Sequence, residues 1–124
     1  MVEVNMLAGI IVSTSADRFA AMEAFYLSVM GAHLRSRRPG FVNFEFGDVR
    51  LTVSVHDRVH GSAREPARLM VNLAVDDADA TADELGALGV LVIRPPENET
   101  WGGRMCTVTD PDGNYLQFMT FPRH

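Results

Sequence analysis

The chain's candidates for chemistry lie where apolar and polar residues alternate. Between positions 48 and 56, aliphatic residues alternate with Arg50, Thr52, Ser54 and His56. Side chains in a strand point alternately to opposite faces, so this period of two predicts a half-buried strand with a polar face. An arginine could pair with an acidic ligand, and a histidine could act as a general acid or base near neutral pH.

Two further segments show the same period. Within 41–46, Phe41, Asn43 and Glu45 share a face, and within 114–120, Tyr115, Gln117 and Met119 share one. A mixture of apolar bulk and a few polar groups is typical of a small-molecule site, and aromatic rings could stack on a planar ligand. The candidate ligand-binding residues are Phe41, Asn43, Glu45, Arg50, Thr52, His56, Met70, Asn72, Trp101, Tyr115 and Gln117.

Several candidates also have a purely structural interpretation. Glu45 and Arg50 could form a cross-strand ion pair that contributes little by itself. Tyr115 could belong to the core, and Trp101 could cover a sheet edge or a dimer contact. Cys106 has no neighbour that would activate it as a nucleophile, so we interpret it as a small buried or half-buried side chain.

The segments that carry these residues form an internal repeat, which is the strongest indicator of fold. Residues 5–57 and 67–122 each begin with an apolar strand, continue with a helical pattern that ends at a glycine, and finish with strands. Residues 58–66 are the polar linker. The sequence therefore predicts one α+β domain over 1–124, built from two βαβββ repeats that form a curved mixed sheet with a central cleft and helices on the outside.

Both helical segments carry end signals. Either residue of Thr14–Ser15 could cap the first helix, and Gly31 is expected to take the left-handed conformation just past its end. In the second half, either residue of Asp76–Asp77 could be the cap, and Gly89 ends the helical pattern. The segment 110–114, Asp-Pro-Asp-Gly-Asn, predicts a tight turn between two strands of a hairpin.

Composition limits the classes of partner. The chain has 124 residues, of which 47% are hydrophobic, and a formal net charge of −5. This charge argues against nucleic acid or an anionic membrane as a partner, because both need clustered lysine and arginine. One cysteine excludes an internal disulfide, and no apolar run is long enough to span a bilayer. We expect a cytoplasmic protein.

Three motifs indicate a family. Ala24-Phe25-Tyr26 leads to Met30-Gly31, and Trp101-Gly102-Gly103-Arg104 precedes the 110–114 turn. Together with the two βαβββ units they resemble the vicinal oxygen chelate superfamily, which contains glyoxalases, bleomycin-resistance proteins and extradiol dioxygenases. The resemblance covers almost the whole chain. It implies a small-molecule ligand in the cleft and a homodimer.

The resemblance also implies where a metal would be held. Metal-dependent members place His, Glu or Gln on inward-facing strand positions, but the first matching segment here, 7–11, has no donor. The other matching positions fall near Thr52, near Met70 and at Gln117. One neutral amide does not hold a catalytic divalent ion, so we expect no cofactor. His56 and His60 offer a rearranged site as the alternative.

Three functions follow as hypotheses. The first is metal-free binding of a small aromatic or amphipathic molecule in the cleft. The alternative is a metal-dependent lyase or dioxygenase with a rearranged ligand set. A third is a metal-independent isomerase that uses Glu45 or His56 as a base. Whether the chain is an enzyme stays open at this point.

Overall fold

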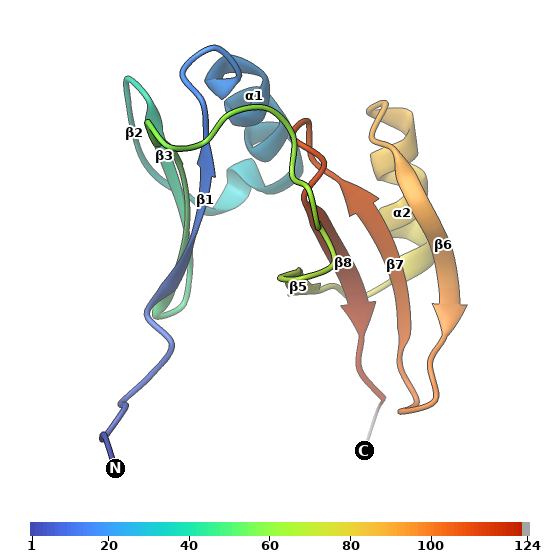
Figure 1. Ribbon diagram of the computed structural model, residues 1–124. Coiled ribbons are helices and arrows are strands. Elements are labelled where there is room, and N and C mark those ends of the chain that lie inside the picture. The colour runs from blue at the N-terminus through green and yellow to red at the C-terminus, as the bar shows by residue number, and fades with distance from the viewer. Residues whose placement is uncertain (123–124) are drawn as a thin grey trace. The chain divides into compact units, whose positions relative to one another are not determined.

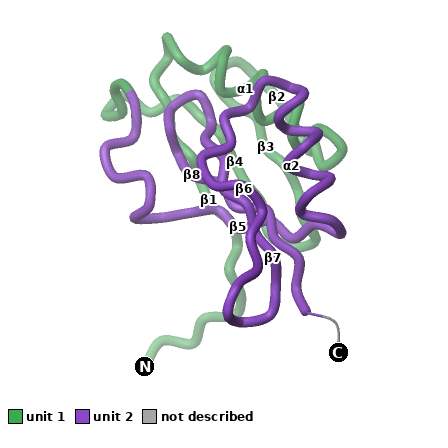
Figure 2. Tube along the Cα trace, turned by 90° about the vertical axis from the view of Figure 1, so that its right-hand side faces the viewer, with its two compact units in different colours: residues 1–61 green, residues 62–124 purple. Residues whose placement is uncertain are grey.

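The computed structural model describes residues 1–122. The chain divides into two compact units, residues 1–61 and 62–124, which are coloured separately in Figure 2. The boundary falls inside the segment 58–66 that the sequence predicts as the linker. No helix in the described part is long and apolar enough to cross a membrane.

The first unit is one βαβββ module with a four-stranded sheet. Strand β1 pairs with β4 in parallel, and the remaining neighbours in the order β1-β4-β3-β2 are antiparallel. Its elements are β1 (Gly9–Thr14), α1 (Phe19–Met30), a 3₁₀ turn η1 (Gly31–His33), β2 (Leu34–Arg38), β3 (Phe41–Phe46) and β4 (Val49–Val55).

The second unit repeats this topology, as the internal repeat predicts. Strand β5 pairs with β8 in parallel, and the order β5-β8-β7-β6 matches that of the first sheet (Figure 1). Its elements are β5 (Val71–Ala74), α2 (Ala78–Ala87), β6 (Val92–Asn98), β7 (Arg104–Thr109) and β8 (Tyr115–Thr120).

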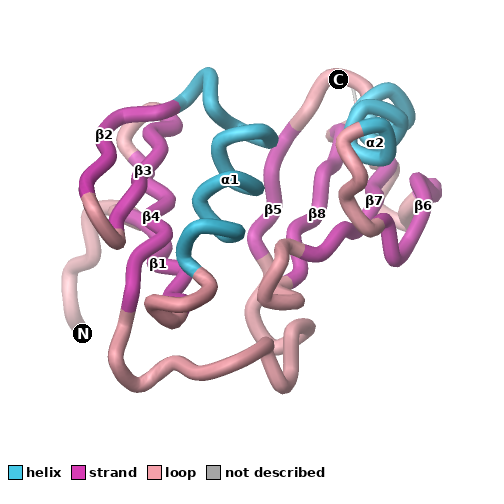
Figure 3. Tube along the Cα trace, turned by 90° about the horizontal axis from the view of Figure 1, so that it is seen from above, coloured by secondary structure: helices cyan, strands magenta, loops and turns pink. Residues whose placement is uncertain are grey.

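Each helix covers one face of its own sheet, as Figure 3 shows from above. In the first unit Met22 and Tyr26 are fully buried, and the Tyr26 ring lies 6.4 Å from that of Phe44 on β3. Leu51 and Val53 of β4 are buried on the same side. The apolar faces of the strands therefore lie under the helix, as expected, and the mixed faces are left open.

The end signals are confirmed for α2 and wrong for α1. The Asp77 carboxylate accepts a hydrogen bond from the backbone N–H of Ala80 at 3.0 Å, and Gly89 has a φ of +82°. Helix α1 instead begins after Arg18, whose side chain makes no capping bond. Gly31 has a φ of −59°, because the chain continues into η1 and never reverses into the left-handed region.

The predicted hairpin turn is present and tightly bonded. Asp110 Oδ1 accepts hydrogen bonds from the backbone N–H groups of Asp112 and Asn114, at 2.9 and 3.0 Å. Asp110 Oδ2 accepts a third, from Asn114 Nδ2 at 2.9 Å. Gly113 has a φ of +84°, which a side chain would disfavour. This turn fixes the register of β7 against β8.

Candidate functional site

The open face of the second sheet carries the best-formed group of predicted site residues. Asn72 of β5 lies opposite Gln117 of β8, and Gln117 lies opposite Thr107 of β7. One step along, Met105 lies opposite Met119. Because these positions alternate with the residues under α2, their side chains all point away from the helix.

A cavity of about 370 Å³ lies on this face. That volume is in the range of small-ligand pockets. None of the lining side chains is charged: they are two carboxamides, two thioethers and two aromatic rings. The lining residues are Asn72, Trp101, Met105, Gln117, Met119 and Phe121.

The two carboxamides differ in how far they are already engaged. Gln117 is 9% exposed, and its Nε2 donates to Thr107 Oγ1 at 3.1 Å. Its carbonyl oxygen accepts no hydrogen bond from the described residues. Asn72 is exposed, and its side chain has no partner within residues 1–122. Unused donors and acceptors therefore face the cavity.

The aromatic wall comes from a short loop and the end of β8. The Trp101 and Phe121 ring centroids lie 5.7 Å apart with an interplanar angle of 45°. A backbone bond from Glu99 N–H to the Gly103 carbonyl, at 2.7 Å, closes the loop, and Gly102 has a φ of +99°. This turn positions Trp101 beside the cavity. Trp101 is 45% exposed, so the cavity opens to solvent.

The arginine of β7, Arg104, is paired with a carboxylate on the helix side of the sheet. The Arg104 guanidinium donates to both carboxylate oxygens of Asp79 at the start of α2, at 2.8 and 2.9 Å, and to Asn98 Oδ1 at 3.1 Å. This bidentate pair holds the pKa of Asp79 below its usual range. It belongs to the helix side of the sheet, because Arg104 alternates with Met105.

Two predicted residues of the second unit lie apart from this cavity. Tyr115 shares the open face of β8, but it lines a separate cavity of about 460 Å³ with the segment 65–68. Within that segment Arg68 and Glu65 already form an ion pair at 2.8 Å. Met70 precedes β5, is 38% exposed, and is not part of either lining.

Most of the predicted residues of the first unit share the open face of its sheet, and two of them form an ion pair there. Arg50 Nη2 lies 3.5 Å from Glu45 Oε1, so the cross-strand pair considered from sequence is present. Asn43 is buried, lies opposite Thr52, and its Oδ1 accepts from Ser36 Oγ at 2.8 Å.

Phe41 and His56 mark the same end of the first sheet. The Arg38 guanidinium lies 3.7 Å above the centre of the Phe41 ring, a cation–π geometry. His56 follows β4 and is exposed, and its Nδ1 accepts a hydrogen bond from the Arg58 backbone N–H at 3.1 Å. That bond leaves Nε2 as the nitrogen that carries the proton in the neutral ring.

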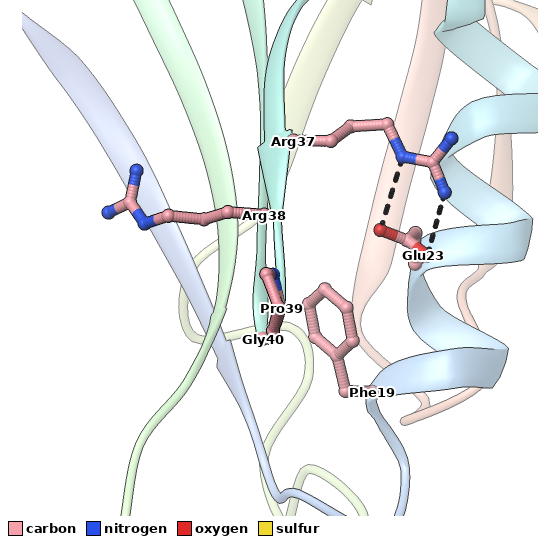
Figure 4. A pocket seen from close by; sticks show the side chains of 6 residues that line it. All are labelled: Phe19, Glu23, Arg37, Arg38, Pro39 and Gly40. Carbon is pink, nitrogen blue, oxygen red and sulfur yellow. Dashed lines mark hydrogen bonds and ion pairs between the residues drawn. The ribbon is translucent and has the colours of Figure 1, made fainter.

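A cavity of the first unit lies beside α1 and not over these residues. It measures about 360 Å³ and is lined by Phe19 and Glu23 of α1 and by the segment 37–40. Figure 4 shows Arg37 directed toward Glu23, at 3.1 Å, while Arg38 points to the opposite side of the strand. Its one carboxylate is thus already paired with an arginine.

The donor set for a metal is poor. Over residues 1–122 no three His, Cys, Asp or Glu side chains come together in a group that could hold an ion. Gln117, where the resemblance implies the last metal ligand, is a neutral amide. Cys106 is fully buried, as expected, and burial raises the pKa of its thiol, so it is a weak ligand and nucleophile at neutral pH.

The candidate ligand-binding residues predicted from the sequence do not include three residues of the cavity, Met105, Met119 and Phe121. Met119 is predicted to share a strand face with Gln117, but it is not among those candidates. A signal for Phe121 was present: it continues the alternation Tyr115, Gln117, Met119 by one more step. Met105 becomes recognisable only once the 110–114 turn fixes which residue of β7 lies opposite Met119. The period of two thus extends one residue beyond the strand.

Comparisons with known proteins agree with this topology. A family model described as the Glyoxalase/Bleomycin resistance protein/Dioxygenase superfamily matches residues 12–118. No curated protein sequence matches significantly.

Among solved structures, a putative glyoxalase family protein from Bacillus anthracis is 19% identical, with 98% of each chain covered and a TM-score of 0.76. A glyoxalase-related enzyme from Fulvimarina pelagi is 20% identical over 94% of this chain and 88% of its own, with a TM-score of 0.77. A lactoylglutathione lyase from Agrobacterium tumefaciens is 21% identical over 94% of each chain, with a TM-score of 0.72. At these identities the likeness concerns the fold.

Proposed function

Because this chain belongs to the glyoxalase/bleomycin resistance protein/dioxygenase superfamily, we propose that it binds a small aromatic or amphipathic molecule without a metal ion. The binding site is the open face of the second sheet. The observation that carries this proposal is the uncharged cavity between Asn72, Trp101 and Gln117, with its thioether and aromatic walls.

The chemistry of the cavity favours binding by burial and stacking. Its aromatic rings and thioethers offer polarisable apolar contacts. Its carboxamides supply the few polar groups that orient a ligand in such sites. A catalytic divalent ion needs three or more protein ligands, and the cavity offers only neutral amide oxygens and thioethers. Binding without a metal therefore fits these side chains better than metal-dependent lyase or dioxygenase chemistry.

A neutral fluorescent probe tests the proposal. Trp101 is the only tryptophan of the chain, so energy transfer from it to N-phenylnaphthylamine reports binding near the cavity. We expect saturable quenching that survives chelator treatment. Met105→Lys should abolish it, because the variant places a charge against the apolar wall. Leu88→Lys, on an exposed residue after α2, should not.

Metal analysis of the same preparation separates the alternatives. Stoichiometric divalent metal, removed by a chelator together with probe binding, would establish the metal-dependent alternative instead. Turnover by metal-free protein that Glu45→Gln or His56→Ala removes would indicate the isomerase. If Met105→Lys and the unsubstituted protein show equal quenching, the probe binds outside this cavity and the proposed site is wrong.

We also propose a homodimer in the cytoplasm. Strand β1 is an edge strand of its sheet, and Ile11 on it is 69% exposed on the open face. Exposed apolar edges favour association. Light scattering after size-exclusion would show a mass twice that of the chain, and Ile11→Lys should reduce that mass to the monomer's.

The free thiol of Cys106 suits a reducing compartment such as the cytoplasm.

A further inference from the structure

Two carboxamides lie side by side in the cavity of the second sheet. Asn72 and Gln117 are direct partners in the parallel pairing of β5 with β8, and both line the cavity. Neighbouring strands of a sheet lie about 4.8 Å apart, so partners on one face are side by side. Both groups can therefore reach the same edge of one ligand.

Most of the hydrogen-bonding groups of these two carboxamides are unused within the described residues. A carboxamide has two N–H donors and one carbonyl acceptor. Gln117 spends one N–H on Thr107 Oγ1, so its carbonyl oxygen and its second N–H remain. Asn72 keeps its whole carboxamide. The pair thus presents donors and acceptors next to each other, which complements a ligand edge that also carries one of each.

The charge of the cavity favours an uncharged ligand. Within residues 1–122, no residue that lines it can neutralise a carboxylate or phosphate group. The guanidinium of Arg104, one residue before Met105, is held by Asp79 on the helix side of the sheet. An unpaired charge that leaves water for an apolar wall loses far more than an uncharged polar group does. These side chains therefore fit a ligand whose polar edge is neutral.

The remaining walls set the shape of the ligand. The rings of Trp101 and Phe121 lie 5.7 Å apart at 45° on one side of the cavity. The unbranched side chains of Met105 and Met119 form another wall and can adapt to a flat surface. A planar ring can contact the aromatic wall and the thioethers while its polar edge reaches the carboxamides.

We propose that this cavity recognises an uncharged planar ring whose edge carries adjacent N–H and C=O groups, as in a lactam or an imide. The inference rests on the proposed function, because it concerns the same cavity, and it adds the chemical class of the ligand. The carbonyl of Gln117 accepts from the ring N–H, and the amide N–H of Asn72 donates to the ring carbonyl.

Three matched compounds test the class. Phthalimide has the required edge, N-methylphthalimide lacks the N–H donor, and phthalate replaces the edge with charge. Titration calorimetry should show that phthalimide binds roughly threefold to tenfold more tightly than N-methylphthalimide, the value of one hydrogen bond. Phthalate should bind more weakly than both. The side-chain NH₂ resonances of Asn72 and Gln117 should shift with phthalimide.

A variant of Asn72 tests the hydrogen bond that this residue donates to the ring carbonyl. Asn72→Leu removes an exposed amide that has no partner within the described residues, so the fold should tolerate it. In that variant we expect phthalimide and N-methylphthalimide each to lose affinity roughly threefold to tenfold, because both keep the ring carbonyl to which Asn72 donates. Asn5→Leu, on an exposed residue of the first unit, is the matched control and should change neither affinity.

The outcomes separate this inference from the proposed function. Equal binding of phthalimide and N-methylphthalimide, or tightest binding of phthalate, would refute the lactam or imide class and leave the cavity as a binding site. Binding of N-phenylnaphthylamine without any response to the three compounds would do the same. If neither the probe nor the compounds bind, both proposals fail together.

Discussion

The indole ring of Trp101 lies against Gly103, two residues along the chain, so closely that Gly103 has room for no side chain. A Cβ atom there would overlap the Trp101 ring and the backbone carbonyl oxygen of Thr120. The glycine is thus needed for close packing and not for an unusual φ. It holds the aromatic wall of the cavity next to the end of β8.

Gly103→Ala should therefore displace Trp101 and destabilise the second unit. Because the Thr120 carbonyl is backbone and cannot rotate away, we expect a loss of about 1–3 kcal/mol in the free energy of unfolding. The Trp101 emission spectrum should also shift. Denaturant melts monitored by circular dichroism measure the first effect, and fluorescence measures the second.

Gly86 provides the matched control in the same unit. It lies inside α2 with open space around its Cα, so Gly86→Ala should stabilise the protein by about 0.5–1 kcal/mol. A Gly103→Ala protein as stable as the Gly86→Ala protein would contradict the packing argument.

Phe121 should contribute to ligand binding and little to stability. It is 62% exposed, and its ring approaches Trp101 at the cavity rim. We expect Phe121→Ala to weaken N-phenylnaphthylamine binding by up to about tenfold, the value of one aromatic contact, with the unfolding free energy changed by less than about 0.5 kcal/mol. Leu88→Ala, also exposed, should leave binding unaltered. A large loss of stability in Phe121→Ala would show that the ring stabilises the fold and does not serve mainly in ligand binding.

Most of the fold could be predicted from local sequence patterns. The repeat, the period of two in β3, β4 and β8, and the Asp110 turn each follow from a single backbone requirement. The ends of α1 could not be predicted, because two nearby hydroxyl residues and a glycine looked like caps. The chain instead starts the helix at Phe19 and continues past Gly31 into a 3₁₀ turn.

The site could be predicted only in part. Alternation placed Asn72 and Gln117 on the open face, since that depends on the strand period alone. It could not show that Tyr115 lines another cavity, because this depends on how the segment 65–68 packs. It also gave no means to find Met105, whose partner is set by the hairpin register.

The side-chain cap of α2 should contribute measurable stability. Asp77 accepts a hydrogen bond from the Ala80 backbone N–H, which no other intrahelical group satisfies. We expect Asp77→Ala to lower the free energy of unfolding by about 1 kcal/mol. Asp76→Ala removes the same charge one residue earlier without a capping bond, so its effect should be smaller. If urea melts show equal losses of stability in the two variants, Asp77 stabilises the helix only through its charge near the helix N-terminus and not through the capping bond.

The carboxylate of Asp110 should contribute more to the free energy of unfolding than that of Asp77. Its carboxylate accepts three hydrogen bonds, two of them from backbone N–H groups. Asp110→Ala leaves those groups without that partner, and Asp110 is only 4% exposed, so we expect a loss of about 2–4 kcal/mol. Asp48→Ala, in the exposed β3–β4 turn, should cost under about 0.5 kcal/mol. A loss at Asp110 no larger than at Asp48 would show that the bonds do not stabilise the hairpin.

The buried thiol of Cys106 should make stability fall at alkaline pH. Burial raises its pKa in the folded protein above the value of about 8.5 that it has when unfolded. The folded state then binds the proton more tightly, so the associated stability is present below that unfolded value and is lost as pH rises through the raised pKa. The stability advantage over Cys106→Ala should therefore shrink as pH rises above the unfolded value of about 8.5. Alkylation by iodoacetamide should be slow in the folded protein and fast in denaturant; rapid alkylation of the folded protein would contradict the burial of this thiol.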